Sequence, residues 1–113
     1  MRVDRQEFEA IAVVSVAEPL EVDLGNADEF KSKVLEAMGD TRLVILDAAR
    51  VEFFDSAGMA ALLSLQKRLA IRDGKLVLAG LNRSILEIFR MVGFDVVFET
   101  YPDVPRAVAA LGG

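Results

Sequence analysis

The sequence predicts a single α/β domain over residues 1–113, with a central mixed, largely parallel sheet of four to five strands and about four helices. Two observations lead to this expectation. Short apolar runs rich in Val, Leu and Ile alternate along the chain with longer segments whose apolar residues recur at helical spacing. The chain also contains no Pro-, Ser- or Gly-rich linker, and its length suits one compact domain with one hydrophobic core.

The first half of the chain predicts strand, helix and strand in that order. Met1–Phe8 and the apolar, β-branched run Ala10–Ala17 predict one or two strands. Ala27–Met38 carries apolar residues at helical spacing, and Asn26 is placed to cap the N-terminus of this helix. After a turn, the short apolar run Leu43–Leu46 fits a buried strand.

The second half begins with a long helix. Ser56–Arg72 predicts this helix, and a turn leads from it into the buried strand Leu76–Leu78. Ser84 and Glu87 have the spacing of a capping box at the start of a third helix. The apolar stripe of that helix is formed by Ile85, Ile88, Phe89 and Val92.

The C-terminal segment predicts one more strand and one more helix. Gly93 lies beyond the end of the third helix, and Val96–Phe98 is expected to form a short strand. Pro105 suits the first turn of a last short helix. The apolar side of that helix is formed by Val104, Val108 and Leu111.

The composition excludes several kinds of chemistry. The sequence has no Cys and no His, so a thiol nucleophile, a serine–histidine–acid triad and nearly all zinc sites are ruled out. The net charge is −5, so the long-range field should repel nucleic acid and anionic lipid. We therefore expect no metal, no cofactor and no enzymatic activity, and we expect the partner to be a protein.

No uncharged stretch approaches the roughly 20 residues that cross a bilayer, so we expect no membrane insertion. The apolar run near the N-terminus is short and follows Glu7 and Glu9 rather than basic residues, which argues against a signal peptide. The expected location is the cytoplasm.

The stretch FFDSAGMAALL, residues 53–63, contains the main candidate site. It places Asp55, Ser56 and Gly58 where a strand turns into a helix. The first N–H groups of a helix lack an intrahelical partner, and the helix dipole adds about half a positive charge there. Either Asp55 or Ser56 can cap these groups. One interpretation is therefore ordinary capping, with Gly58 easing a tight entry, and the other is a functional serine.

From about Val13 to Leu111, the order of elements and this motif resemble the STAS domain of bacterial anti-sigma factor antagonists. In that family an acid-Ser-small-Gly sequence opens a helix after a buried strand, and the matching residues here are Asp55, Ser56, Ala57 and Gly58. The segment NRSILEIFRMVGF also resembles the late pattern of the family. Ala57 stands where a second hydroxyl is common, and the turn glycine expected within EPLEVDLGNADEF is missing.

The resemblance implies a regulatory binding protein. In the family, the serine that corresponds to Ser56 is phosphorylated by a partner that is both an anti-sigma factor and a serine kinase. The unphosphorylated form would bind this partner and release the sigma factor. Phosphorylation would end the complex, and a phosphatase acting on phosphorylated Ser56 would restore it. The nucleotide and Mg²⁺ would belong to the partner.

Beside Ser56, the segment 57–63 has no charged side chain. A helix packed on a sheet needs an apolar stripe of only about 100°, so Met59 and Leu63 are partly surplus to the core. Either a loop covers them, or they form a small apolar patch on which the partner docks. In the second case, Gly58 would let the backbone of the partner approach closely.

Two other functions stay open. A STAS-like domain can be a structural subunit of a membrane transport complex or of a stress-sensing assembly, because one fold serves several roles. A receiver-like phosphoacceptor at Asp47, at a predicted strand end, fits the length and the order of elements but lacks an N-terminal acidic pair for Mg²⁺. The sequence gives no indication of the oligomeric state.

Overall fold

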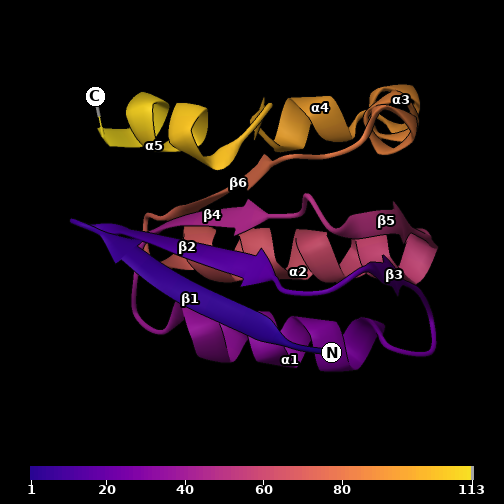
Figure 1. Ribbon diagram of the computed structural model, residues 1–113, viewed down its shortest axis with the longest axis horizontal. Helices are drawn as coiled ribbons and strands as arrows, with labels where there is room; N and C mark the ends of the chain where they lie inside the picture. Colours follow the sequence, from indigo (N-terminus) through magenta and orange to yellow (C-terminus); the bar gives the residue numbers. More distant parts are fainter. Residues whose placement is uncertain (113) are drawn as a thin grey trace.

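The computed structural model describes residues 1–112 and contains a central five-stranded sheet with helices on both faces (Figure 1). The strand order in this sheet is β1 (Val3–Phe8), β2 (Ile11–Val16), β4 (Leu43–Asp47), β6 (Lys75–Ala79) and β7 (Thr100–Tyr101). A separate two-stranded sheet is formed by β3 (Leu20–Val22) and β5 (Val51–Phe54). The helices are α1 (Ala27–Met38), α2 (Ser56–Ile71), α3 (Arg83–Val92), α4 (Phe94–Val97) and α5 (Val104–Gly112).

The central sheet is mixed and largely parallel, as predicted. The N-terminal segment forms two strands, because β1 and β2 pair as an antiparallel hairpin whose turn holds Glu9 at a φ of 56°. The pairs β2–β4, β4–β6 and β6–β7 are parallel. In the second sheet β3 and β5 are also parallel, and both strands lead directly into the loops that precede α1 and α2.

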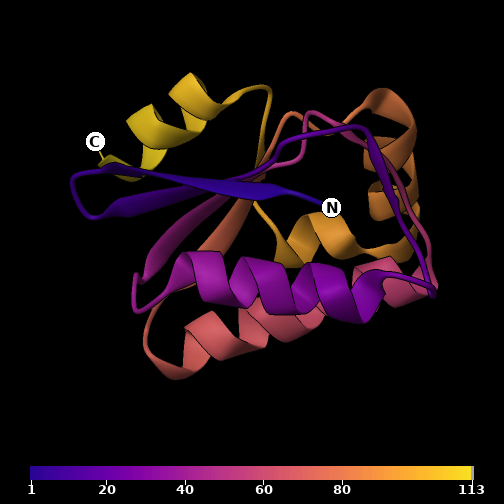
Figure 2. The same cartoon turned by 60° about the horizontal axis from the view of Figure 1, so that its bottom comes forward.

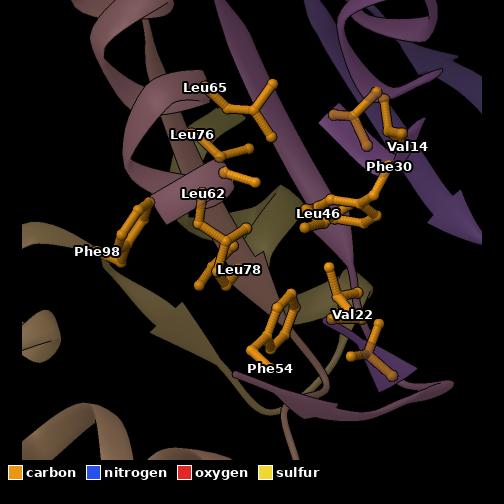
Figure 3. Close-up of a cluster of buried hydrophobic side chains, with 14 of the residues drawn as sticks. Val14, Val22, Phe30, Leu46, Phe54, Leu62, Leu65, Leu76, Leu78 and Phe98 are labelled. Atoms are coloured by element: carbon orange, nitrogen blue, oxygen red, sulfur yellow. The ribbon is translucent and has the colours of Figure 1, made fainter. Parts of the chain in front are cut away.

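The two faces of the sheet bury separate cores. Helices α1 and α2 lie side by side on one face, and α5 covers the other (Figures 1 and 2). The larger core lies under α1 and α2, and it includes Val14, Phe30, Leu46, Phe54, Leu62, Leu65 and Leu78 (Figure 3). The smaller core lies under α5, and it includes Ile11, Val13, Ile45, Val77 and Ala107. This division follows from the alternation of side chains along each strand.

Helix α1 occupies the predicted range, but Asn26 does not cap it with its side chain. Its Oδ1 accepts a hydrogen bond from the backbone N–H of Asp23 at 2.9 Å, and its Nδ2 donates to the carbonyl of Glu21 at 2.8 Å. The amide therefore closes the loop between β3 and α1, which explains the difference from the expected cap.

The far end of α1 is held by arginines from other elements, since its last turn has no basic residue. Arg5 in β1 donates to the carbonyl of Met38 at 3.0 Å. Arg72, directly after α2, donates to the carbonyls of Gly39 at 2.9 Å and Thr41 at 3.0 Å. These charge-assisted bonds satisfy the last carbonyl of α1 and two carbonyls of the loop after it, and they fix the C-terminal ends of α1 and α2 next to each other.

The strand predicted at Val96–Phe98 is wrong. Phe94–Val97 forms the short helix α4, and the strand follows only at Thr100–Tyr101. One helical turn brings the rings of Phe94 and Phe98 to a centroid distance of 5.6 Å, whereas a strand would hold these residues about 13 Å apart. Packing of the aromatic rings therefore overrides the β-branched local sequence, and residues 1–112 contain five helices rather than about four.

The capping box predicted for α3 is also wrong. Asn82 is the N-cap, and its Oδ1 accepts from the backbone N–H of Ile85 at 2.9 Å. The helix begins at Arg83, so Ser84 already lies inside it and cannot act as the cap. Gly93 follows the end of α3, as expected, and it has the left-handed conformation, with a φ of 82°.

A polar cluster joins the two strands at the β7 edge of the sheet. The Lys75 ammonium lies 2.6 Å from one carboxylate oxygen of Glu99, and the Tyr101 hydroxyl donates to the other at 2.8 Å. The hydrogen bonds from Lys75 and then from Tyr101 lower the pKa of Glu99. The bond to Glu99 raises the pKa of Tyr101.

Candidate functional site

Asp55 connects three elements at the start of α2. Its backbone N–H donates to the carbonyl of Val22 at the end of β3, at 3.0 Å. Its Oδ1 accepts from the N–H of Gly58 at 2.9 Å and so caps α2, while its Oδ2 accepts from the N–H of Leu24 at 3.0 Å. Of the two residues that the sequence offered as caps, Asp55 therefore fills the role and Ser56 does not.

Ser56 is the first residue of α2, and it is exposed. Because Asp55 caps the helix, the Ser56 hydroxyl is not needed for capping. The first turn of α2 contains no acidic side chain, whereas the first turn of α1 contains Asp28 and Glu29. The N-terminus of a helix favours negative charge, so this position suits a phosphate group better than most surface positions.

Gly58 faces the interior. A Cβ atom at this position would lie 2.6 Å from the carbonyl oxygen of Val22 and 3.2 Å from the Phe54 ring, so a larger residue cannot fit without movement of the backbone. The close approach is therefore to a strand of the same chain, and the expectation that Gly58 admits the backbone of a partner is wrong. Gly58 lets α2 begin directly against β3, which places Ser56 at the surface.

The loop before α1 lies beside Ser56 and was missed as part of the site. Asp23 orders this loop, because its Oδ1 accepts from the N–H of Gly25 at 2.9 Å. The side chain of Leu24 is 84% exposed, and the Leu24 backbone is bonded to Asp55. Within the stretch EPLEVDLGNADEF no local pattern signals this contact, since the two bonded residues are 31 positions apart.

Met59 and Leu63 are half-buried and pack against the larger core. They contribute less free apolar surface than expected for a patch on which a partner docks. Ala60, between them in the sequence, is exposed. The predicted patch is thus a partly exposed extension of the core, and the most exposed apolar side chain near Ser56 belongs to Leu24.

A groove of about 230 Å³ opens between α1 and α2 at the Ser56 end. We call it the proximal groove. Ala57, which the motif places directly after Ser56, is half-buried and forms part of the lining. The full lining is Leu24, Ala27, Asp28, Lys31, Ala57, Ala60 and Ala61. Small side chains from α2 and one exposed leucine from the loop therefore meet beside the candidate phosphoacceptor.

Asp47, the alternative phosphoacceptor, lies at the end of β4. It accepts from the Ser15 hydroxyl at 3.4 Å and from the backbone N–H of Ala49 at 3.1 Å. Within residues 1–112, no three carboxylate side chains are grouped closely enough to hold a metal ion. The structure gives the receiver-like alternative no support.

Solved structures share this fold. A Thermotoga maritima protein that is assigned as an anti-sigma factor antagonist matches with a TM-score of 0.87 at 16% identity, over 98% of this chain and 95% of that one. The antagonist SpoIIAA in its unphosphorylated form matches with a TM-score of 0.75 at 16% identity, over 99% and 98% of the two chains. The phosphorylated form of SpoIIAA from Bacillus matches at 0.70 with 17% identity, over 97% and 99%.

The same fold also occurs inside a larger membrane protein. The murine anion transporter named solute carrier 26 family member A9 matches with a TM-score of 0.79 at 24% identity, over 92% of this chain but only 18% of the transporter. In the part of the present chain that the structure describes, no helix has the length and apolar character needed to cross a bilayer.

The sequence itself matches the STAS domain family over residues 2–107. BtrV of Bordetella bronchiseptica, which is assigned as an anti-sigma factor antagonist, is 33% identical over 91 residues, or 79% of this chain and 78% of BtrV. These matches agree with the element order and with the position of the Asp55–Gly58 motif where β5 passes into the first turn of α2. The chain belongs to the STAS domain family, and anti-sigma factor antagonists are among its homologues.

Proposed function

We propose that the chain is an anti-sigma factor antagonist that is switched by phosphorylation of Ser56. The unphosphorylated form binds an anti-sigma factor with serine kinase activity and thereby releases the sigma factor. The kinase then transfers phosphate from ATP to Ser56, and the complex separates. A phosphatase acting on phosphorylated Ser56 returns the chain to its binding form. On this proposal the chain is a cytoplasmic regulatory protein and a kinase substrate.

The observation that carries the proposal is that Asp55 and Ser56 have different roles at the start of α2. The Asp55 carboxylate makes the structural contacts of the junction, to Gly58 and to Leu24. Ser56 is thereby left exposed on the first turn of a sixteen-residue helix. A structural cap and a modifiable hydroxyl thus occupy adjacent positions without competing.

The physical effect of phosphate at this position also fits a switch. A phosphoserine carries about −1.5 to −2 charges at neutral pH. The α2 dipole offsets part of this charge, so the fold should survive. A partner docked beside Ser56 would meet a bulky anionic group next to the Asp55 carboxylate. We therefore expect phosphorylation to break a complex rather than to unfold the protein.

The experiment is phosphorylation of the purified chain by a candidate anti-sigma kinase from the same organism, with Mg²⁺ and ATP, followed by peptide mapping. We expect one phosphate per chain, on Ser56, and none on Ser56→Ala. Ser32→Ala, at another exposed helical serine, is the matched control and should be modified normally. Phosphate on Ser15, Ser32, Ser64 or Ser84 would contradict the proposal. Phosphate that is lost in acid would point to Asp47, because an acyl phosphate is labile in acid and phosphoserine is stable.

A second candidate function is that of a structural subunit in a membrane transport complex. The similarity to a segment of an anion transporter favours it. Purification from the native cell separates the two functions. Recovery with an integral membrane transport protein, without phosphate on Ser56, would favour the structural role.

A further inference from the structure

Helices α1 and α2 run parallel, and the outer surface where they lie side by side is continuous (Figure 2). We call this surface the seam. Their N-terminal ends meet through the Leu24–Asp55 hydrogen bond, and their C-terminal ends meet through the bonds from Arg72 to the carbonyls of Gly39 and Thr41. The sixteen residues of α2 make this seam about 24 Å long. It begins at Ser56 and ends at the α1–β4 loop.

The seam is hollowed at both ends. The proximal groove lies beside Ser56, and a distal groove of about 340 Å³ lies at the C-terminal ends of the helices. The distal groove is lined by Leu35, Met38, Gly39, Arg68, Ile71 and Arg72. Each groove carries one strongly exposed apolar side chain, Leu24 at 84% and Ile71 at 85%. Strongly exposed apolar side chains beside two surface grooves are typical of a docking surface.

The charge of the seam is opposite to that of the whole protein. The lining of the two grooves includes the cations Lys31, Arg68 and Arg72 but only one carboxylate, Asp28. Lys67 is exposed on the same helix. Among residues 1–112, the ion pairs involve other basic side chains, namely Arg2, Arg5, Lys33, Lys75, Arg83 and Arg106. In a chain of net charge −5, a cluster of cations that form no ion pair within residues 1–112 favours an acidic partner, although Arg72 is also bonded to loop carbonyls.

We propose that this seam binds an acidic amphipathic helix of a protein partner. We call the surface formed by Leu24, Lys31, Ala60, Lys67, Arg68 and Ile71 the cationic seam. The alanines along α2 let a second helix approach closely, the apolar side chains of that helix enter the two grooves, and its carboxylates meet the cations between them. The inference rests on the proposed function, because phosphate on Ser56 would place negative charge at one end of the seam and repel such a helix.

The test uses the full chain and a synthetic helical peptide of about 18 residues, with Leu on one face and Glu on both flanks. A second peptide carries Lys in place of Glu. We expect the Glu peptide to bind, to shift the amide resonances of the cationic seam, and to lose affinity as salt is raised. The paired change Lys67→Glu and Arg68→Glu should weaken binding at least about tenfold. The matched control, Arg83→Glu with Arg90→Glu, makes the same change of net charge on α3 and should alter affinity less than about twofold.

Several outcomes would overturn the inference. These are equal binding of the Lys peptide, resonance shifts confined to α3 or α5, and binding to anionic phospholipid vesicles without binding to the Glu peptide. The neutral double variant Lys67→Gln and Arg68→Gln, whose fold is checked by a thermal melt, distinguishes loss of binding from loss of fold. The peptide assay needs no kinase, so its failure is distinct from failure of Ser56 phosphorylation. If the variant Ser56→Glu binds the Glu peptide more weakly than the unchanged chain does, the seam is supported as the surface that the switch controls.

Discussion

The carboxylate of Asp55 holds the junction beside Ser56, the proposed phosphorylation site. Each of its oxygens has its own backbone donor, Gly58 in α2 and Leu24 in the loop before α1. The two bonds fix the helix start and the neighbouring loop relative to each other. Ser56 therefore lies exposed beside a hydrogen-bonded junction of three segments.

Substitutions at Asp55 should separate the contributions of its two hydrogen bonds to the free energy of unfolding. Asp55→Ala removes both acceptors, and we expect it to lower the free energy of unfolding by about 2 kcal/mol. Asp55→Asn keeps one oxygen for the cap but presents an amide N–H to the Leu24 donor, so the expected loss is about 1 kcal/mol. Urea unfolding measures the loss of free energy of unfolding for both variants. Asp28→Asn, in the first turn of α1, is the control. Equal losses for the two Asp55 variants would show that the bonds do not contribute separately.

At the scale of elements, the contact between α2 and β3 places the site. The first turn of α2 touches the backbone of Val22, and Gly58 is the residue that permits this distance. The parallel course of α1 and α2 then follows from the two junctions at their ends, Leu24 with Asp55 and Gly39 with Arg72. The grooves of the seam are therefore a consequence of how the helices are anchored.

Gly58→Ala tests the α2–β3 contact. The new Cβ would sit 2.6 Å from the Val22 carbonyl oxygen, and the resulting shift should cost about 1–3 kcal/mol. The higher helix propensity of alanine offsets up to about 1 kcal/mol of this cost. We expect a net loss of about 1–2 kcal/mol in urea unfolding. Ala60→Leu, which adds bulk on the exposed side of the same helix, should cost little. An unchanged or higher stability of Gly58→Ala would contradict the close contact.

At the scale of the molecule, the parts predicted from sequence are those set by local periodicity. The range of α1, the buried strands β4 and β6 and the start of α2 all follow from apolar spacing and flanking turn residues. The inward position of Gly58 could have been predicted in the same way, because it lies four residues before Leu62 on the buried stripe of α2. Of the two interpretations of Gly58, a tight entry into the helix agrees with its contact to Val22, and close approach of a partner does not.

The features that sequence did not reveal depend on contacts between distant segments. The short helix α4 is decided by ring packing of Phe94 with Phe89 and Phe98, which overrides a strand-like local pattern. The place of Leu24 in the site depends on a hydrogen bond to Asp55 across 31 positions. The two grooves exist only because α1 and α2 lie side by side. The place of Ser56 at the start of α2 was predicted because its motif is local, and its phosphorylation stays a prediction.

The proposed Ser56 switch is tested most directly by calorimetric binding of the chain to a candidate anti-sigma factor, before and after stoichiometric phosphorylation, with a thermal melt of both forms. We expect phosphorylation to weaken binding at least about a hundredfold, because an added dianion in the interface costs several kcal/mol. The melting temperatures should stay within a few degrees of each other, since α2 tolerates negative charge at its N-terminus. Equal affinity of the two forms, or unfolding of the phosphorylated form, would contradict the switch.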